Sequence, residues 1–195
     1  MIFLIRHGQS TSNERGLLVG RSNPPLTPHG REQARRLVPH LLGVCEVWCS
    51  PLERARDTAR LAIPTIEPVV KESFIEVDYG SLEGQSLSSI TDEQWHDFEG
   101  HHDRPLLDGE SLVEVDARVH AELDALLADP RSLLHSDDEH LAIVSHVSPI
   151  KSATTWALGV HGSAAWRMRI DNASMTVLAV RHGTPSAVRV NVVPL

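Results

Sequence analysis

The chain has 195 residues, which is enough for one domain with a hydrophobic core. Its 41% hydrophobic and 23% charged residues are typical of a water-soluble protein, and no apolar run approaches the roughly 20 residues of a membrane-spanning helix. The net charge of −8 disfavours nucleic acid as a partner, but a small anionic ligand depends only on local charge. The apolar start is too short for a signal peptide and has no basic region before it, so we expect a cytoplasmic protein with no membrane partner.

Apolar residues and turn formers alternate along the chain in a way that predicts strands alternating with helices. Thr27 and Pro28 mark one helix start, since Thr is a good N-cap and Pro suits the first helical position. Strands are expected at about 1–6, 44–49, 141–145, 174–180 and 187–193, helices at about 28–42, 51–62, 86–98, 111–128 and 149–158, and loops at 64–85 and 99–109. This order indicates an α/β fold, a three-layer sandwich with a mostly parallel central sheet and helices on both faces, in a single domain over residues 1–195.

Three of the predicted strands end in residues that can bind or attack an anion. The first runs into Arg6 and His7, the second leads to Arg54, and the third runs into His146. Because ligands of parallel sheets sit beyond the carboxyl ends of the strands, neighbouring strands would bring these side chains together. Two arginines and two histidines around one point would clamp an oxyanion, since a guanidinium group matches phosphate oxygens in pairs.

Short motifs in a fixed order extend over nearly the whole chain. They are Phe3-Leu4-Ile5-Arg6-His7-Gly8-Gln9-Ser10 with Asn13, Pro25-Leu26-Thr27 with Gly30, Gln33 and Ala34, Ser50-Pro51-Leu52-Glu53-Arg54-Ala55 with Thr58-Ala59, Glu76-Val77-Asp78-Tyr79-Gly80 with Glu83-Gly84, Gly109-Glu110-Ser111, and Val144-Ser145-His146. In this order they resemble the histidine phosphatase (phosphoglycerate mutase-like) superfamily. Any one tripeptide is a weak signal, whereas the ordered set is strong.

The resemblance implies a catalytic set of five residues. His7 would attack phosphorus and become a phosphohistidine, which requires an unprotonated ring nitrogen. Arg6, Arg54 and His146 would hold the phosphoryl oxygens. Glu76 would protonate the leaving alkoxide and then take a proton from the attacking water. No cofactor and no metal are expected, since fixed cations would replace Mg²⁺.

Four further residues are implied to contact the substrate. Asn13 would add a neutral donor, Gly20 forms a turn, Arg21 would contact the organic part, and the backbone N–H of Val147 would face phosphate. The chain departs from the family pattern at Val19, where a polar residue is frequent. It departs again after His146, where many members have small residues.

The expected function is hydrolysis of small phosphorylated metabolites through this phosphohistidine. The alternative is a phosphoglycerate mutase, which returns the phosphoryl group to the substrate. Mutases of the superfamily typically have a longer segment between the acid and the second histidine, with extra basic residues. Between Glu76 and His146 this chain has only Arg104, Arg118 and Arg131, which favours a phosphatase. A binding module with a dead site would lack part of the catalytic set, and none is lost. Specificity would lie in residues 15–24 and 86–109; residues 20–24 leave an alpha-ribazole phosphatase open.

Other histidines and aromatic residues have plainer interpretations. Residues 181–183 repeat Arg-His-Gly, but they precede another strand and are expected to form a hairpin turn. His96, His101 and His102 match no metal signature and are expected in a solvated, substrate-facing lid near the cleft. Trp156 and Trp166 would pack inside the chain or in a homodimer interface. The two cysteines, Cys45 and Cys49, are expected to be unbridged core residues.

Overall fold

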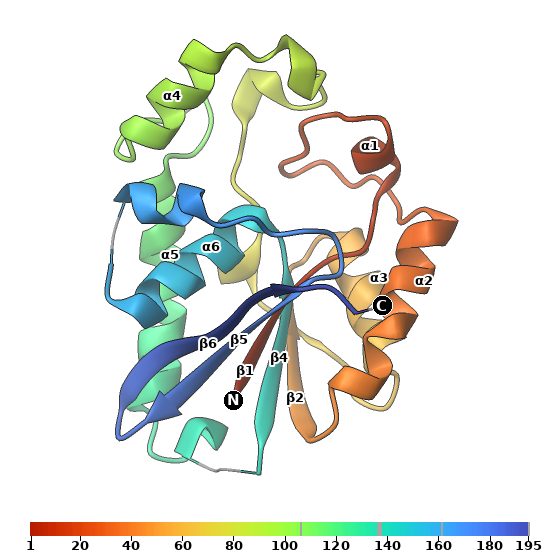
Figure 1. Ribbon diagram of the computed structural model, residues 1–195, viewed down its shortest axis with the longest axis vertical. Helices are drawn as coiled ribbons and strands as arrows, with labels where there is room; N and C mark the ends of the chain where they lie inside the picture. Colours follow the sequence, from red (N-terminus) through yellow and green to blue (C-terminus); the bar gives the residue numbers. More distant parts are fainter. Residues whose placement is uncertain (106, 136–137, 161, 195) are drawn as a thin grey trace.

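The computed structural model describes residues 1–105, 107–135, 138–160 and 162–194. In this part of the chain a six-stranded sheet runs through the molecule in the order β3-β2-β4-β1-β5-β6 (Figure 1). The strands are β1 (Ile2–Arg6), β2 (Val44–Cys49), β3 (Val69–Val70), β4 (His140–Ser145), β5 (Met175–Arg181) and β6 (Thr184–Val192). The strands β1 to β4 are parallel to one another, whereas β5 pairs antiparallel with β1 and β6 pairs antiparallel with β5. The expected fold class is confirmed.

Helices cover both faces of this sheet. They are α1 (Thr11–Glu14), α2 (Pro28–Arg36), α3 (Glu53–Ala62), α4 (Asp92–Gly100), α5 (Leu112–Ala128) and α6 (Val147–Leu158). Figure 1 shows α5 and α6 on one side of the strands and α2 and α3 on the other. None of the helices in the described ranges is both long and apolar enough to cross a membrane.

The strands alternate their side chains between two hydrophobic cores. On β1, Ile2 and Leu4 belong to the core under α5 and α6, whereas Phe3 and Ile5 belong to the core under α2 and α3. These four side chains are at most 7% exposed, as expected for a strand that is covered on both faces. The near-continuous apolar run in the sequence reflects this double burial.

Capping side chains explain where three helices begin. Thr27 accepts a hydrogen bond from the N–H of Gly30 and so starts α2. Thr91 and Ser111 form capping boxes that start α4 and α5. The box at Thr91 corrects the expected helix at 86–98, because α4 begins at Asp92 and extends to Gly100. The helix expected to run from 28 to about 42 is also shorter, and α2 ends at Arg36.

One expected core residue lies at the surface. Cys45 is exposed, whereas Cys49 is buried, and both are free thiols. The pairing of β2 with β4 shifts register between Val44 and Glu46, so the start of β2 does not continue the inward face of Cys49. The prediction that Cys45 lies in the core is therefore wrong, while the absence of a bridge to Cys49 agrees with the structure.

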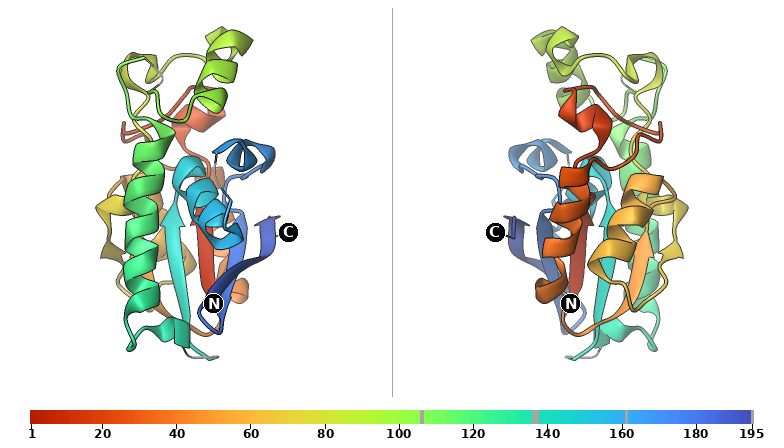
Figure 2. Two further views of the ribbon diagram at one scale, coloured as in Figure 1. Left: turned by 90° about the vertical axis from the view of Figure 1, so that its left-hand side faces the viewer. Right: turned by 90° about the vertical axis from the view of Figure 1, so that its right-hand side faces the viewer.

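Several segments meet above the carboxyl ends of the parallel strands. Figure 2 shows α4 and the segment that carries α1 lying beyond the same end of the sheet. The antiparallel strand β5 runs the other way, so the turn at 182–183 lies beyond the amino end of β1, as the pairing of Ile2 with Leu178 shows. The second Arg-His-Gly sequence is therefore at the opposite end of the sheet from His7, in the hairpin turn that the sequence predicts.

Candidate active site

Strand pairing brings the two predicted histidines together. Arg6 on β1 pairs with Ser145 on β4, so His7 and His146 leave the sheet side by side. The N–H of His7 donates to the carbonyl of Ser145 over 3.0 Å. The ring centroids of His7 and His146 are 5.0 Å apart. Both side chains are buried, at 4% and 0% exposed.

The hydrogen bonds of His7 fix its tautomer. Nδ1 lies 2.7 Å from the carbonyl oxygen of Gly8, which can only accept, so Nδ1 carries the proton. Nε2 accepts a hydrogen bond from Nε of Arg54 over 3.1 Å and therefore has no proton. Burial, followed by the charges of Arg54 and Arg6, holds the pKa of His7 well below its ordinary value. The ring is thus neutral, with the lone pair of Nε2 directed toward a guanidinium group.

Arg54 is anchored by a loop on its other side. It is 1% exposed, and its Nη1 and Nη2 donate to the carbonyls of Ser22 and Gly20 over 2.6 and 2.7 Å. Burial lowers the pKa of Arg54 to about 10, so the side chain is charged at neutral pH. A Cβ on Gly20 would lie 2.6 Å from the carbonyl oxygen of Val77, which leaves room only for glycine. Gly20, expected as a substrate contact, therefore serves as a backbone acceptor for Arg54.

Glu83 holds that loop in place. Its Oε2 accepts from the N–H groups of Gly20 and Arg21 over 2.8 and 3.2 Å, and its Oε1 accepts from the hydroxyl of Ser22. Thr58 supports the opposite side, since its hydroxyl accepts from the N–H of Gly8 and donates to the carbonyl of Arg54. Neither Glu83 nor Thr58 was expected in the site, although both stand in the motifs that carry the resemblance.

Arg6 and His146 each have one buried nitrogen without a partner in the described part of the structure. Arg6 donates through Nη1 to the carbonyl of Ile170 over 2.7 Å, and its Nε is unpaired. Nε2 of His146 lies 2.7 Å from the hydroxyl of Ser50, and its Nδ1 is unpaired. Burial lowers the pKa of both side chains. Since buried polar atoms are normally hydrogen-bonded, the two unpaired nitrogens are candidates for contact with an anion.

Glu76 lies at the amino end of α6. Its Oε2 accepts from the N–H of Val147 over 3.1 Å, and its Oε1 accepts from the N–H groups of Ser148 and Val77 over 3.2 and 2.9 Å. The first N–H groups of a helix have no partner within it and favour a negative charge. The N–H of Val147, expected to face phosphate, therefore donates to Glu76 in this structure.

Of the other two residues that were expected to contact the substrate, only Asn13 lies at the site. Asn13 lies beside Arg6 and His7 in the lining of one cavity, and its Oδ1 accepts from Nδ2 of Asn172 over 3.3 Å. Arg21 instead points to acidic residues outside the cavity, with Nη1 3.4 Å from Asp78 and Nη2 3.2 Å from Glu110. The structure thus brings Asn13 to the site but gives Arg21 no place among the residues that line it.

A cavity of about 200 Å³ opens onto five of the predicted site residues, but Arg54 and His146 are not among the residues that line it. Its lining residues are Arg6, His7, Asn13, Leu17, Leu18, Val19, Glu76, Tyr79, Leu87, Trp95, Val147 and Trp166. The polar members gather at the strand ends, and the apolar members come from the surrounding segments. The two indoles were not expected in the site.

His96, His101 and His102 do not line the cavity at His7. His96 and His101 are exposed, and they lie on and directly after α4 with His101 bonded to Asp97. His102 lines a separate small cavity. Within the residues that the structure describes, no group of three or more histidines, cysteines or carboxylates is placed to hold a metal ion.

Comparison with known proteins identifies the family of the chain. Residues 2–193 match the family model described as the histidine phosphatase superfamily (branch 1). The chain is 30% identical to a probable phosphoglycerate mutase, GpmB, of Enterobacter sp., over 90% of this chain and 82% of that one.

Two solved structures have the same fold. Phosphoserine phosphatase of Entamoeba histolytica in complex with 3-phosphoglyceric acid is 25% identical, with a TM-score of 0.84 over 97% of this chain and 95% of that one. A mycobacterial glucosyl-3-phosphoglycerate phosphatase with VO3 has a TM-score of 0.88 at 22% identity, over 98% of each chain. The family, the relative and the first of these two structures together indicate phosphatase or phosphotransferase activity. The chain belongs to the histidine phosphatase superfamily, branch 1.

Proposed function

We propose that the chain is a phosphomonoester hydrolase that works through a phosphohistidine on His7 and acts on small phosphorylated metabolites. The observation that carries this proposal is the state of His7. Its Nδ1–H is bound by the carbonyl of Gly8, which leaves Nε2 as an unprotonated nitrogen beside Arg54. A histidine that attacks through Nε2 needs the tautomer with its proton on Nδ1.

In the first half-reaction, Nε2 of His7 forms a bond to phosphorus while the bond from phosphorus to the ester oxygen breaks. A protonated Glu76 carboxyl gives its proton to the leaving oxygen, so an alcohol departs and the carboxylate remains. The hydrogen bonds that this carboxylate accepts from Val147 and Ser148 stabilise its charge.

In the second half-reaction, water attacks phosphorus and the bond to Nε2 breaks. The Glu76 carboxylate takes a proton from the water, which restores the carboxyl group and returns His7 to its neutral form. Inorganic phosphate leaves. One carboxyl group acts first as acid and then as base because the two half-reactions mirror each other.

Charge on the transferring group is balanced by the fixed cations Arg54 and Arg6 and by the ring of His146, which its lowered pKa keeps neutral. Arg54 presents its Nε, and Arg6 and His146 each have a buried nitrogen without a protein partner in the described residues. Donors that are already in place at a site screened from water are worth more than donors in solution. We therefore propose that the reaction needs no added metal ion.

The alternative within the same family is a phosphoglycerate mutase, as one relative is named. A mutase needs cationic groups for the carboxylate of phosphoglycerate as well as for phosphate. Among the described residues that line the catalytic cavity, the only arginine is Arg6, and none is a lysine. The two neighbours named as phosphatases also support hydrolysis.

The test is phosphate release from p-nitrophenyl phosphate, 2-phenylethyl phosphate and 3-phosphoglycerate in the presence of EDTA. Wild-type protein is expected to release phosphate, and His7→Ala is expected to release none while keeping the wild-type circular dichroism spectrum. Activity retained by folded His7→Ala would contradict the mechanism. Conversion of 3- to 2-phosphoglycerate without phosphate release would favour the mutase instead.

A further inference from the structure

The part of the catalytic cavity away from the strand ends is apolar. Leu17, Leu18 and Val19 line it from the segment after α1. Leu87 lines it from a short 3₁₀ turn and Trp95 from α4. A group that binds here loses contact with water and gains contact with aliphatic and indole surfaces, which favours an apolar group.

Two indoles connect this cavity to an outer groove. Trp95 and Trp166 line the catalytic cavity and also a more open groove of about 480 Å³. Asp92, Glu99, His96 and Lys151 complete the groove. An organic group that extends from the phosphoryl site would therefore pass the two indoles before it reaches solvent.

One buried phenyl ring holds both indoles in place. Phe98 is 1% exposed, and its centroid lies 5.6 Å from that of Trp166 and 6.4 Å from that of Trp95. Tyr79, which also lines the cavity, is 6.1 Å from Phe98. Because Trp95 and Trp166 lie on separate segments, their shared contact with Phe98 fixes the spacing of the cavity walls. Rigid walls reduce the ordering cost of binding.

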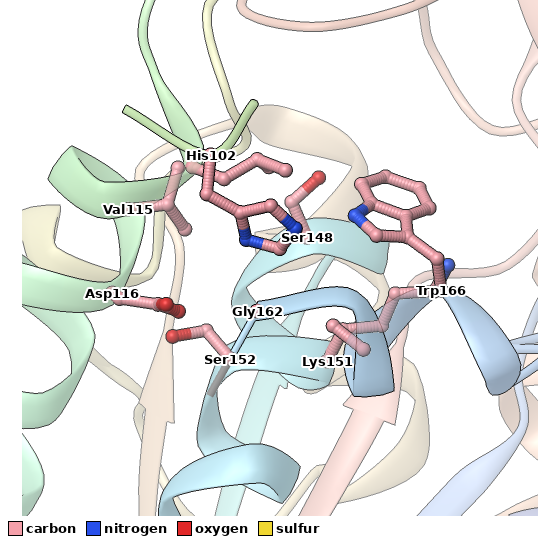
Figure 3. Close-up of a pocket in the computed structure, with 10 residues that line it drawn as sticks. His102, Val115, Asp116, Ser148, Lys151, Ser152, Gly162 and Trp166 are labelled. Carbon is pink, nitrogen blue, oxygen red and sulfur yellow. The ribbon is translucent and has the colours of Figure 1, made fainter. Parts of the chain in front are cut away.

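Trp166 also separates the catalytic cavity from a lysine. Lys151 lies on α6 one turn after Val147, and its Nζ is 3.8 Å from the centroid of the Trp166 ring. Lys151 lines a neighbouring cavity of about 20 Å³, in which Figure 3 shows it beside Trp166, Ser148 and Ser152. Trp166 lines both cavities, whereas Lys151 does not line the catalytic one. The charge of Lys151 is thus engaged with the indole and is not presented to the catalytic cavity.

We infer that the preferred substrates are phosphomonoesters of an uncharged apolar alcohol or phenol, aromatic by preference, whose organic group lies against Trp95 and Trp166. This inference rests on the proposed phosphatase activity and adds the class of leaving group. Small carboxylated esters such as phosphoglycerate lack the apolar surface that these walls bind. Their charge also finds no free lysine or arginine among the described lining residues beyond the phosphoryl site.

The first experiment compares kcat/KM for 1-naphthyl phosphate, phenyl phosphate and 3-phosphoglycerate with wild-type protein. The two aryl leaving groups have similar acidity, so a difference between them reports the contact with the larger ring system. We expect kcat/KM for 1-naphthyl phosphate to exceed that for phenyl phosphate by about tenfold, because the larger ring buries more area and makes an aromatic contact. We expect 3-phosphoglycerate to have the lowest kcat/KM of the three. Equal values for the two aryl esters, or a preference for 3-phosphoglycerate, would overturn the inference while leaving the phosphatase intact. Hydrolysis of no ester would remove the proposed function itself.

Variants then locate the preference. Trp95→Ala and Trp166→Ala should each lose the advantage of 1-naphthyl phosphate, whereas Trp166→Phe should keep most of it. Inhibition by inorganic phosphate should not change, because the phosphoryl site is untouched. Trp156→Phe is the matched control, since its indole donates to Asp124 and lines none of these cavities.

A double variant tests whether Trp166 keeps the charge of Lys151 away from the catalytic cavity. Trp166→Ala should raise the activity on 3-phosphoglycerate relative to phenyl phosphate, because Lys151 is released from the indole. Lys151→Met in the same chain should abolish that gain. A Trp166→Ala protein that keeps the wild-type ratios of kcat/KM among the three esters would contradict the role of both side chains.

Discussion

The Nε–H of Arg54 donates to Nε2 of His7 over 3.1 Å. The nitrogen that is proposed to attack phosphorus is therefore held by the cation that is proposed to bind the phosphoryl oxygens. The two Nη groups of Arg54 are already bound by the carbonyls of Gly20 and Ser22, so Nε is the group directed to the site. A substrate oxygen would replace Nε2 as the acceptor, which frees the lone pair as the phosphoryl group arrives.

Arg54→Lys should lower kcat/KM for p-nitrophenyl phosphate by about 100-fold, the loss typical of one preorganised donor. Lysine keeps the charge, but its single ammonium group cannot bind two loop carbonyls and also face His7. Steady-state kinetics measure the effect. Arg60→Lys is the matched control, because Arg60 lies on the same helix and pairs with Glu67 at the surface. A loss of less than threefold in Arg54→Lys would show that charge alone is sufficient.

Glu76→Gln should slow an alkyl ester by about 100-fold more than p-nitrophenyl phosphate. A poor leaving group needs a proton from Glu76, whereas p-nitrophenolate leaves without one. The comparison uses kcat/KM for 2-phenylethyl phosphate and p-nitrophenyl phosphate, since this ratio reports formation of the phosphohistidine and not its hydrolysis. Equal slowing of both esters would remove Glu76 from the role of acid.

Much of the sheet could be predicted because its signals are local. The strands β1, β2 and β4 are apolar runs, and the start of α2 is marked by Thr27 and Pro28. The edge strand β3 has only Val69 and Val70 and exists through its pairing with β2, which no local pattern shows. The short helix α1 was missed for a similar reason, since its four residues contain no apolar period.

The site was predictable where residues follow strand ends or family motifs. His7 and His146 leave adjacent parallel strands, and Arg54 begins the helix after a third. The bond from Val147 to Glu76 joins distant segments and depends on where α6 begins, so the sequence did not show it. Trp95 and Trp166 were missed as lining residues because they lie on separate segments that pack against the same Phe98 ring.

Glu83→Ala should lower kcat by about tenfold while KM changes little. The loss in kcat should be the same for aryl and alkyl esters. Glu83 does not line the catalytic cavity but binds the loop whose carbonyls hold Arg54, so it acts as a positioning residue. Arg21→Ala is the contrasting variant and should stay within about twofold of wild type, since pairs this exposed contribute little. A large rise in KM with unchanged kcat in Glu83→Ala would indicate a direct substrate contact instead.

Gly30→Ala should lower the free energy of unfolding by about 2–3 kcal/mol, within the range for overpacking. A Cβ at this position would lie 2.0 Å from the carbonyl oxygen of Gln9, which is backbone and cannot turn aside. Urea unfolding measures the change. Gly100→Ala is the control, because a Cβ there meets no atom within 4 Å, and it should be neutral or slightly stabilising. Equal stability of the two variants would contradict the close approach of α2 to the segment after His7.

The free energy of unfolding should fall as pH drops below 6.5, and His7 should cause part of this fall. The pKa of His7 in the folded chain lies well below its ordinary value because of burial and the nearby arginines. At a pH between the pKa of His7 in the folded chain and its pKa in the unfolded chain, only the unfolded chain binds a proton at this residue. The free energy of unfolding therefore declines by about 1.4 kcal/mol for each unit that the pH falls. Above pH 6.5 the group is neutral in both states and contributes no slope. His7→Asn should therefore lose less stability than wild type between pH 8 and pH 5, as measured by urea unfolding. His182→Asn, at the exposed turn between β5 and β6, is the control and should keep the wild-type dependence of stability on pH. If His7→Asn also kept that dependence, His7 would not be held neutral in the folded chain.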